Sequence, residues 1–186
     1  MHIVMKPAEI ALFSAFLTTA DSYFEYGMGG STFLASQCVR KRVAAIDSDP
    51  GWVANVRKTI GETTKEIVLS HVDIGETGAW GNPKGRTHEH RFPSYSRAIL
   101  DQPKDLDLCL VDGRFRVSCF LTALAHLRPD AILAIHDYRS RPHYFEVETF
   151  ARPIARAETL ALFVRRSDAD LSAIRERAEA TRLDPR

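Results

Sequence analysis

The sequence predicts a three-layer α/β/α protein built on a mostly parallel sheet, and three observations support this. Strand-like and helix-like segments alternate from residue 23 to residue 135. Two of the strand-like segments, LDLCLV and AILAI, are almost continuously apolar, as strands covered on both faces must be. A glycine-rich turn at residues 25–32 joins the first strand to the next helix. Such alternation gives right-handed parallel crossovers, so ligands are expected beyond the carboxyl ends of the strands.

Each element follows from the spacing of apolar residues. An amphipathic helix over 7–19 precedes the sheet, since Ile10, Phe13, Phe16 and Leu17 recur at helical spacing. Further helices are predicted at 31–39, 50–60, 95–100 and 117–127, and strands at 23–26, 42–46, 67–72, 106–111 and 131–135. Residues 149–157 and 159–165 are predicted to form an antiparallel C-terminal hairpin, which brings the sheet to seven strands. A last helix is expected to pack weakly, because few apolar residues stand among its charges: Leu171, Ile174 and Ala178.

Length and composition indicate one domain over residues 1–186, with an N-terminal helix in 1–20 and a helical extension in 166–186. A net charge of +1 provides no field that would attract nucleic acid, so no nucleic-acid partner is expected. The apolar stretch at 10–17 is too short to span a membrane. Cys38, Cys109 and Cys119 lack paired spacing, which favours free thiols and a cytoplasmic protein. The oligomeric state stays open, and a homo-oligomer is one option.

The connection from 73 to 106 is long for a compact domain and combines glycines, prolines, histidines and aromatic residues. A substrate lid and a packed surface excursion are equally compatible with this composition. The histidines of its HEH segment, His88 and His90, are simplest as solvated loop residues, because two histidines alone do not define a zinc site.

The glycine-rich turn indicates an adenosine-containing ligand. Gly27 and Gly29 begin a dinucleotide-binding pattern, but Thr32 stands where its third glycine would fall. Ser31 is expected to cap the helix that starts there. Asp47 ends the second strand, where a carboxylate can accept both hydroxyls of a ribose. The alternative role for Asp47, capping the following helix, suits Asp49 better because Asp49 directly precedes Pro50.

These residues resemble the class I S-adenosylmethionine (SAM)-dependent methyltransferases, in which strand one ends in an acid followed by GxG and strand two ends in an acid. The resemblance implies a Rossmann-like fold and SAM as cofactor, which lacks a pyrophosphate and so relaxes the need for a glycine at Thr32. By resemblance, Glu25 anchors the methionine end; its alternative role is to satisfy nearby backbone N–H groups. Asp73 is likewise expected to accept from the adenine amino group, with a simple turn former as the alternative.

Two acids follow neighbouring strands, Asp112 in VDGRFR and Asp137 in IHDYR. The pair resembles the small-molecule O-methyltransferase branch, where such acids hold a divalent cation such as Mg²⁺ near the acceptor oxygen. Tyr138 and Phe115 stand where that branch has Asn and His, so the cation is left open. Without a cation, the general base would be one of three residues: Asp112, His136 and Asp137.

Several arginines follow the same strands, namely Arg114, Arg116, Arg139 and Arg141. They suggest an anionic acceptor, although a charged rim paired with nearby glutamates explains them equally well. The sequence therefore predicts SAM-dependent methyl transfer to a small molecule, most simply at oxygen. The alternatives are a non-catalytic methyltransferase-like interaction module and a nicotinamide-dependent oxidoreductase, which Thr32 and Glu25 disfavour.

Overall fold

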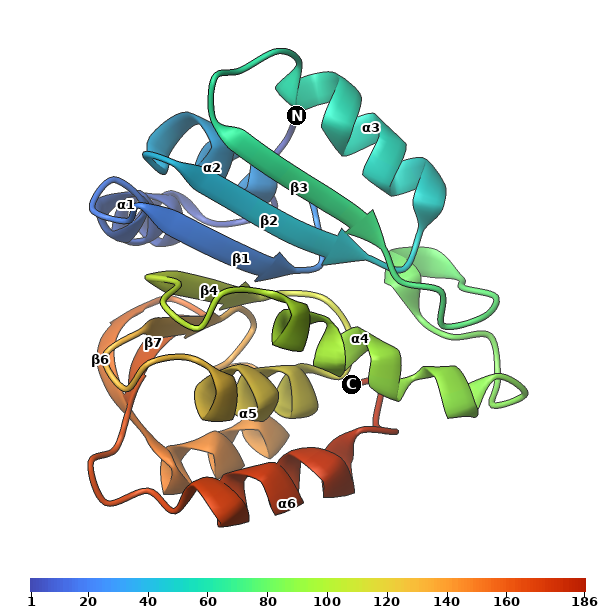
Figure 1. The fold of residues 1–186 in the computed structure, drawn as a ribbon, viewed down its shortest axis with the longest axis vertical. Coiled ribbons are helices and arrows are strands. Elements are labelled where there is room, and N and C mark those ends of the chain that lie inside the picture. Colours follow the sequence, from blue (N-terminus) through green and yellow to red (C-terminus); the bar gives the residue numbers. More distant parts are fainter.

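The computed structural model describes residues 1–186 and contains a seven-stranded sheet with helices on both faces (Figure 1). The sheet order is β3-β2-β1-β4-β5-β7-β6, and β7 runs antiparallel to both of its neighbours. The strands are β1 (Ser22–Tyr26), β2 (Arg42–Asp47), β3 (Glu66–His71), β4 (Leu108–Val111), β5 (Ile132–Ile135), β6 (Ala151–Ala157) and β7 (Leu160–Arg165). The predicted fold class is confirmed, including the antiparallel hairpin at the C-terminal edge.

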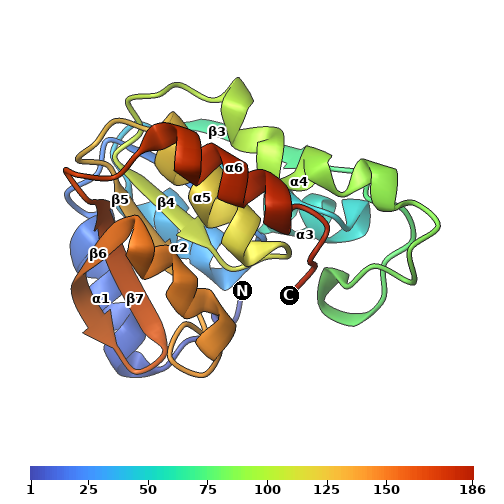
Figure 2. The ribbon, with the colours of Figure 1, turned by 90° about the horizontal axis from the view of Figure 1, so that it is seen from below.

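The helices form two layers, one on each face of the sheet (Figures 1 and 2). One layer contains α1 (Pro7–Leu17), α2 (Gly30–Cys38) and α3 (Pro50–Ile60), and the other contains α4 (Pro93–Arg97), α5 (Arg116–His126) and α6 (Leu171–Thr181). Strand side chains alternate between the two layers, so Phe24 packs with α5 while Tyr23 packs with α1. Phe24 and Tyr23 thus belong to two buried apolar clusters, one on each face of the sheet. The packing of these clusters holds in place the strand ends where a ligand is expected.

The C-terminal helix α6 packs more firmly than its sequence predicted. Ile174 is fully buried and Ala178 nearly so, and both belong to the larger apolar cluster. Across this interface, the Ser118 hydroxyl donates to the Ala178 carbonyl oxygen at 3.0 Å. The expectation of weak packing was wrong, because a few apolar residues on one side of α6 are enough to fill the surface of α5.

The loop from β3 to β4 contains short elements that the sequence did not resolve. Three 3₁₀ turns occupy Ala79–Gly81, Glu89–Arg91 and Ala98–Asp101, and an isolated bridge pairs Thr77 with Pro83. The loop is anchored in the core by Ile74 and Phe92, which are both buried. A further 3₁₀ segment, Pro142–Thr149, lies between β5 and β6.

All three cysteines are free, as expected, and Cys109 and Cys119 are buried. None of the helices combines the length and the apolar character that a bilayer crossing requires.

Candidate active site

The glycine turn lies between β1 and α2 and touches the backbone that follows β4. Gly27 has a φ of 87°, and its N–H donates to the Ile46 carbonyl at 2.9 Å. A Cβ atom at Gly27 would lie 2.5 Å from the Gly113 Cα, so only glycine fits here. A Cβ at Gly29 would meet no atom within 4 Å. Gly27 is therefore required by the contact between strand ends, whereas Gly29 leaves open space that a ligand can enter.

Glu25 lies beneath the first turn of α2 and is completely buried. Its carboxyl group accepts hydrogen bonds from the Ser31 hydroxyl and, at 2.7 Å, from the Thr32 hydroxyl. Burial raises the pKa of Glu25 to about 8, because no cation balances its charge and the two hydroxyls offset only part of the desolvation. In this arrangement Glu25 carries a proton at neutral pH.

The start of α2 is capped differently from the prediction. The helix begins at Gly30, and the Ser31 hydroxyl donates to Glu25 instead of capping a backbone N–H group. The Thr32 hydroxyl accepts from the Gly29 N–H at 2.9 Å and so satisfies the turn. The prediction of Ser31 as the cap was wrong, because the buried carboxyl group competes for its hydroxyl. Thr32, at the position of the missing glycine, serves both the turn and Glu25.

Asp47 braces the same turn from the end of β2. One of its carboxylate oxygens accepts from the Met28 N–H at 3.0 Å and the other from the Asp49 N–H at 2.9 Å. Burial raises the pKa of Asp47, and these two hydrogen bonds oppose that rise. On the other side of Met28, the Trp52 indole N–H donates to its carbonyl oxygen at 2.7 Å. Asp49 accepts from the Trp52 N–H and caps α3, as expected.

Asp73 is an exposed residue just beyond β3. One carboxylate oxygen accepts from the Gly75 N–H at 2.8 Å, and the other contacts the Arg91 guanidinium at 2.6 Å. The Gly75 hydrogen bond is the main cause of a lowered pKa for Asp73, and Arg91 adds to it. Both oxygens therefore already have partners within the loop.

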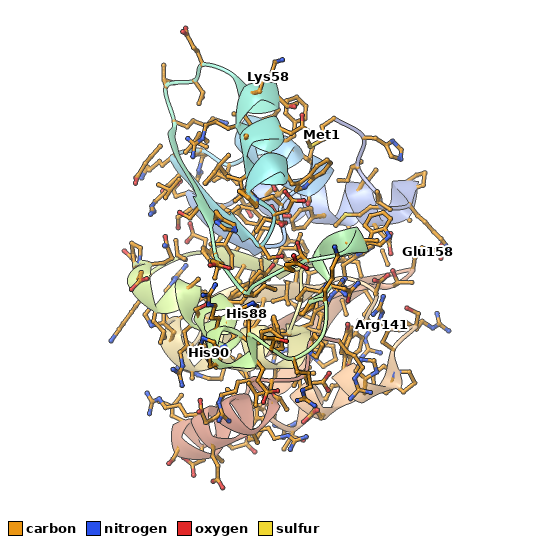
Figure 3. All side chains as sticks on the ribbon, turned by 90° about the vertical axis from the view of Figure 1, so that its right-hand side faces the viewer. Met1, Lys58, His88, His90, Arg141 and Glu158 are labelled. Atoms are coloured by element: carbon orange, nitrogen blue, oxygen red, sulfur yellow. The ribbon has the colours of Figure 1, made fainter.

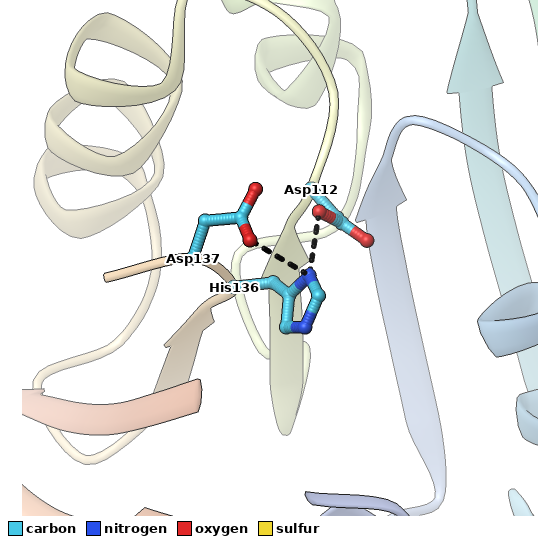
Figure 4. A group of neighbouring side chains, drawn as sticks. All are labelled: Asp112, His136 and Asp137. Carbon is cyan, nitrogen blue, oxygen red and sulfur yellow. Dashed lines mark hydrogen bonds and ion pairs between the residues drawn. The ribbon is translucent and has the colours of Figure 1, made fainter. Parts of the chain in front are cut away.

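The ends of β4 and β5 bring three predicted residues together (Figure 4). The His136 Nδ1 lies 3.2 Å from Asp112 Oδ1 and 4.0 Å from Asp137 Oδ1. One side-chain N or O atom from each of Asp112, His136 and Asp137 falls within 4.8 Å of the others. The sequence placed these residues together correctly, since β4 and β5 are parallel neighbours.

Arg116 lies directly behind this group, in a buried position that the sequence did not predict. Its side chain is only 4% exposed and contacts Asp112 at 3.1 Å and Asp137 at 3.3 Å. The same guanidinium donates to the backbone carbonyls of Gly113 and His136, at 3.0 and 2.6 Å. Arg116 thus joins the ends of β4 and β5 and neutralises charge between the two acids. The available signal was its position four residues after Asp112, in the first turn of a helix.

Glu9, on α1, is a second residue that the sequence reasoning missed. It is 1% exposed, and one of its oxygens lies 3.4 Å from His136 Nε2. The other oxygen accepts from the Thr159 N–H and hydroxyl, at 2.8 and 2.6 Å, and from the Leu160 N–H. Burial alone would raise the pKa of Glu9, but the hydrogen bonds from Thr159 and Lys6 outweigh it and lower this pKa to about 2. The sequence feature that could have identified Glu9 was a carboxylate on an otherwise apolar helix.

His136 therefore lies between carboxylates on both of its ring nitrogens. Burial by itself would lower the pKa of His136, but the hydrogen bond and charge of Asp112 outweigh it, with smaller contributions from Asp137 and Glu9. The net shift is upward. The imidazole is thus stabilised as a cation whose two N–H groups point at Asp112 and Glu9.

The loop from β3 to β4 crosses the edge formed by these strand ends (Figure 3). Its Gly81 carbonyl lies 3.5 Å from the Ser48 hydroxyl just beyond β2, and Asn82 accepts from Arg114 at 2.9 Å just beyond β4. Trp80 is 79% exposed in the same loop. His88 and His90 lie further along it, outside the group at Asp112. The loop thus bridges the two sides of the predicted cofactor site.

Comparison with solved structures places this geometry in a known fold. A methyltransferase-like protein from Silicibacter pomeroyi DSS-3 is 29% identical, with a TM-score of 0.87 over 99% of this chain and 98% of that one. The chain has the class I methyltransferase fold. The likeness to SAM-dependent methyltransferases that the glycine turn suggested is confirmed.

More distant structures share this methyltransferase fold. A ribosomal protein L11 methylase from Lactobacillus delbrueckii subsp. bulgaricus is 13% identical, with a TM-score of 0.56 over 84% of this chain and 79% of that one. An RNA methyltransferase from Salinibacter ruber, solved with S-adenosyl-L-homocysteine, is also 13% identical, with a TM-score of 0.53 over 90% and 97%. No known family profile and no curated protein matches the sequence.

Proposed function

We propose that this methyltransferase-fold protein transfers the methyl group of SAM to an oxygen atom of a small molecule. One observation carries the proposal: the backbone of Gly27 abuts that of Gly113. The turn that would hold the cofactor therefore adjoins Asp112, which begins the cluster of ionisable groups. Donor and acceptor would meet where the ends of β1 and β4 touch.

The residues of the turn fit SAM. Gly29 faces open space, and the Asp47 oxygens, which accept from the Met28 and Asp49 N–H groups, keep further lone pairs for the ribose hydroxyls. Glu25 would hold the ammonium group only by losing its proton, since it carries one beneath α2. Asp73 would face the adenine amino group at the far end, where it already contacts Arg91. Ser31 acts through Glu25 and would position it.

Bound SAM supplies a methyl group that its sulfonium already activates, so the protein's task is to position the acceptor and remove a proton. Both ring nitrogens of His136 face carboxylates, and Asp137 contacts Arg116 and Arg141. Asp112 keeps an oxygen that points away from His136 (Figure 4). Asp112 would therefore orient the acceptor hydroxyl and take its proton as the new C–O bond forms and the S–C bond breaks. His136 and Arg116 position Asp112.

The same acids do not fit a divalent cation in this arrangement. Mg²⁺ requires oxygen ligands at about 2.0–2.1 Å in near-octahedral geometry. Asp112 and Asp137 are instead held by the Arg116 guanidinium at 3.1 and 3.3 Å, with the imidazole of His136 adjoining. A cation bridging them would have to share these carboxylates with buried positive charge. We therefore propose that Arg116 supplies the charge neutralisation that the O-methyltransferase resemblance assigned to a metal.

Calorimetric titration with SAM, S-adenosyl-L-homocysteine and NAD tests the cofactor. We expect the first two to bind, and Asp47→Ala to weaken both by tenfold or more because the ribose contacts are lost. Asp49→Ala is the matched control, since Asp49 caps α3 on the neighbouring turn and should leave affinity unchanged. Binding of NAD alone would refute the proposal, as would equal SAM affinity in Asp47→Ala.

A panel of acceptors tests the reaction. Methyl transfer from labelled SAM should be detected with a hydroxylated small molecule, should persist in EDTA and should be lost in Asp112→Asn. Methylation of an RNA in the panel, with no transfer to any small molecule, would overturn the proposed acceptor class. SAM binding without transfer to any member would favour a non-catalytic module. Activity that EDTA abolishes and Mg²⁺ restores would refute the role of Arg116.

A further inference from the structure

A cavity of about 560 Å³ lies where the chain leaves β5 and enters β7. Its wall includes Tyr138 and Arg139, which directly follow Asp137, and Thr159 and Leu160 at the start of β7. Sites for small molecules typically enclose about 300–1,000 Å³. The cavity is therefore large enough to hold a small molecule.

Two sides of this cavity adjoin the ionisable groups around His136. The Tyr138 N–H donates to the Thr159 carbonyl oxygen at 2.8 Å, so these two sides are in contact with each other. The Thr159 hydroxyl donates to Glu9 at 2.6 Å, and the other oxygen of Glu9 lies 3.4 Å from His136 Nε2. Next to Tyr138 in the chain, Asp137 Oδ1 lies 4.0 Å from His136 Nδ1. A molecule in the cavity would therefore lie beside the cluster where the reaction is proposed to occur.

The wall of the cavity carries an aromatic surface that is open to solvent. Phe145 is 44% exposed, whereas the neighbouring Tyr138 is only 3% exposed. The centres of the two rings lie 5.0 Å apart, with their planes tilted by 45°. Because Phe145 lines the cavity and Tyr138 covers only part of it, the free surface of its ring can pack against an aromatic ring of a ligand.

The charged groups of the wall leave one positive charge without a counter-ion. Arg156 is paired with Glu148 at 2.7 Å, and Glu158 is paired with Lys6 at 3.1 Å. Arg139 is exposed and forms no ion pair. A guanidinium group suits a carboxylate, because the two can form a pair of charge-assisted hydrogen bonds. The wall therefore favours a ligand with an anionic group over a neutral or cationic one.

We propose that this cavity binds the body of the acceptor and that the acceptor is a hydroxylated aromatic carboxylate. The ring packs against Phe145, the carboxylate pairs with Arg139, and the hydroxyl extends past Asp137 towards Asp112. A phenolic hydroxyl also suits a carboxylate as proton acceptor, since its pKa of about 10 lies far below that of water. The inference rests on the proposed function, because the ligand of the cavity is the molecule that receives the methyl group.

Calorimetric titration in the absence of SAM tests the cavity, with p-hydroxycinnamate and its uncharged amide as probes. We expect the acid to bind at least tenfold more tightly than the amide, and Arg139→Gln to remove this preference. Arg152→Gln is the matched control, because Arg152 is exposed on β6 and does not line the cavity. Equal affinities for acid and amide in the unmodified protein would overturn the proposal, as would binding of neither probe or equal affinities for the acid in the two arginine variants.

Phe145→Ala tests the aromatic contact. It should weaken the binding of acid and amide alike by at least tenfold, because the ring of either probe loses its packing partner. Leu100→Ala is the matched control, since Leu100 is 50% exposed outside this cavity and should leave both affinities unchanged. Unchanged affinities in Phe145→Ala would refute the assignment of an aromatic ligand. Arg139→Gln removes no ion pair, so its comparison of acid with amide remains decisive if Phe145→Ala fails to fold.

Methyl transfer separates the cavity from the proposed function. Arg139→Gln should raise the KM for a hydroxylated aromatic acid and leave kcat nearly unchanged, because Arg139 would bind the acceptor away from the reacting atoms. Acid binding that depends on Arg139, in a protein that methylates no hydroxylated small molecule, would refute the proposed function alone. Transfer to a hydroxylated small molecule with the same KM in Arg139→Gln and the unmodified protein would refute the cavity alone.

Discussion

Replacing Glu25 with Gln should remove a large pH dependence from the stability of the fold. The carboxyl group is fully buried and accepts hydrogen bonds from the hydroxyls of Ser31 and Thr32. No cation lies close enough to pair with it, so its charged form is disfavoured by burial. Glutamine has nearly the same shape and can accept a hydroxyl hydrogen, but it cannot ionise.

The size of the effect follows from the shift in pKa. The pKa of Glu25 rises from 4.5 to about 8 on folding. A shift of roughly 3.5 units corresponds to about 5 kcal/mol at 1.36 kcal/mol per unit. The folded state keeps a proton that the unfolded chain loses above pH 4.5, so the free energy of unfolding falls as pH rises from 4.5 to about 8. Above pH 8 both states are ionised and this contribution levels off.

Urea unfolding followed by circular dichroism between pH 5 and pH 9 measures the effect. The difference between Glu25→Gln and the unmodified protein should grow in favour of the variant over this range. Glu62→Gln is the matched control, because Glu62 is exposed beyond α3 and should leave the profile unchanged. Parallel profiles for Glu25→Gln and the unmodified protein would mean that Glu25 is ionised throughout, and the burial argument would be refuted.

Three further predictions follow from the site. Glu9→Gln should lower the free energy of unfolding by about 3 kcal/mol at neutral pH, because the lowered pKa of Glu9 stabilises the fold above pH 4.5 and this stabilisation is lost as pH falls towards 2. The stabilities of the variant and the unmodified protein should therefore converge on acid titration. A constant difference between them would contradict the prediction. Gly27→Ala should lower the free energy of unfolding by about 3 kcal/mol or more, because Gly27 has a φ of 87° and contacts Gly113. Gly29→Ala should leave thermal stability nearly unchanged and weaken SAM binding. Equal stability losses in the two variants would contradict this prediction. If Glu25 holds the SAM ammonium group, SAM binding at pH 7 should release most of a proton from Glu25. Calorimetry in two buffers of different ionisation enthalpy measures this release. A binding heat that does not depend on the buffer would exclude the contact.

The sequence predicted those parts of the site that depend on neighbouring strands. Asp112 and Asp137 end adjacent parallel strands, so topology alone brings them together. The same reasoning placed Asp47 beside the glycine turn, where it binds the Met28 N–H. The alternation of strands and helices can be recognised locally, and it predicts which residues lie together at the carboxyl ends of neighbouring strands.

Contacts that depend on packing could not be predicted in this way. Glu9 contacts His136 because α1 packs beside the C-terminal hairpin, and no local sequence pattern predicts that contact. Arg116 resembled a surface arginine, but the sheet buries it beneath both acids. Ser31 resembled a cap until a buried carboxyl group competed for its hydroxyl. In each case a partner distant in sequence or hidden below the surface decided the role.

The position of Glu9 also affects how the chain reaches its native state. Its carboxylate gains its strongest hydrogen bonds from Thr159, 150 residues further along the chain. Until β7 forms, those donors are absent, and burying a charged carboxylate on α1 is unfavourable. Contacts of such long sequence separation form late and slow the folding of a domain. Docking of α1 is therefore expected among the last steps of folding, so the environment of His136 is completed only after nearly the whole chain has been assembled.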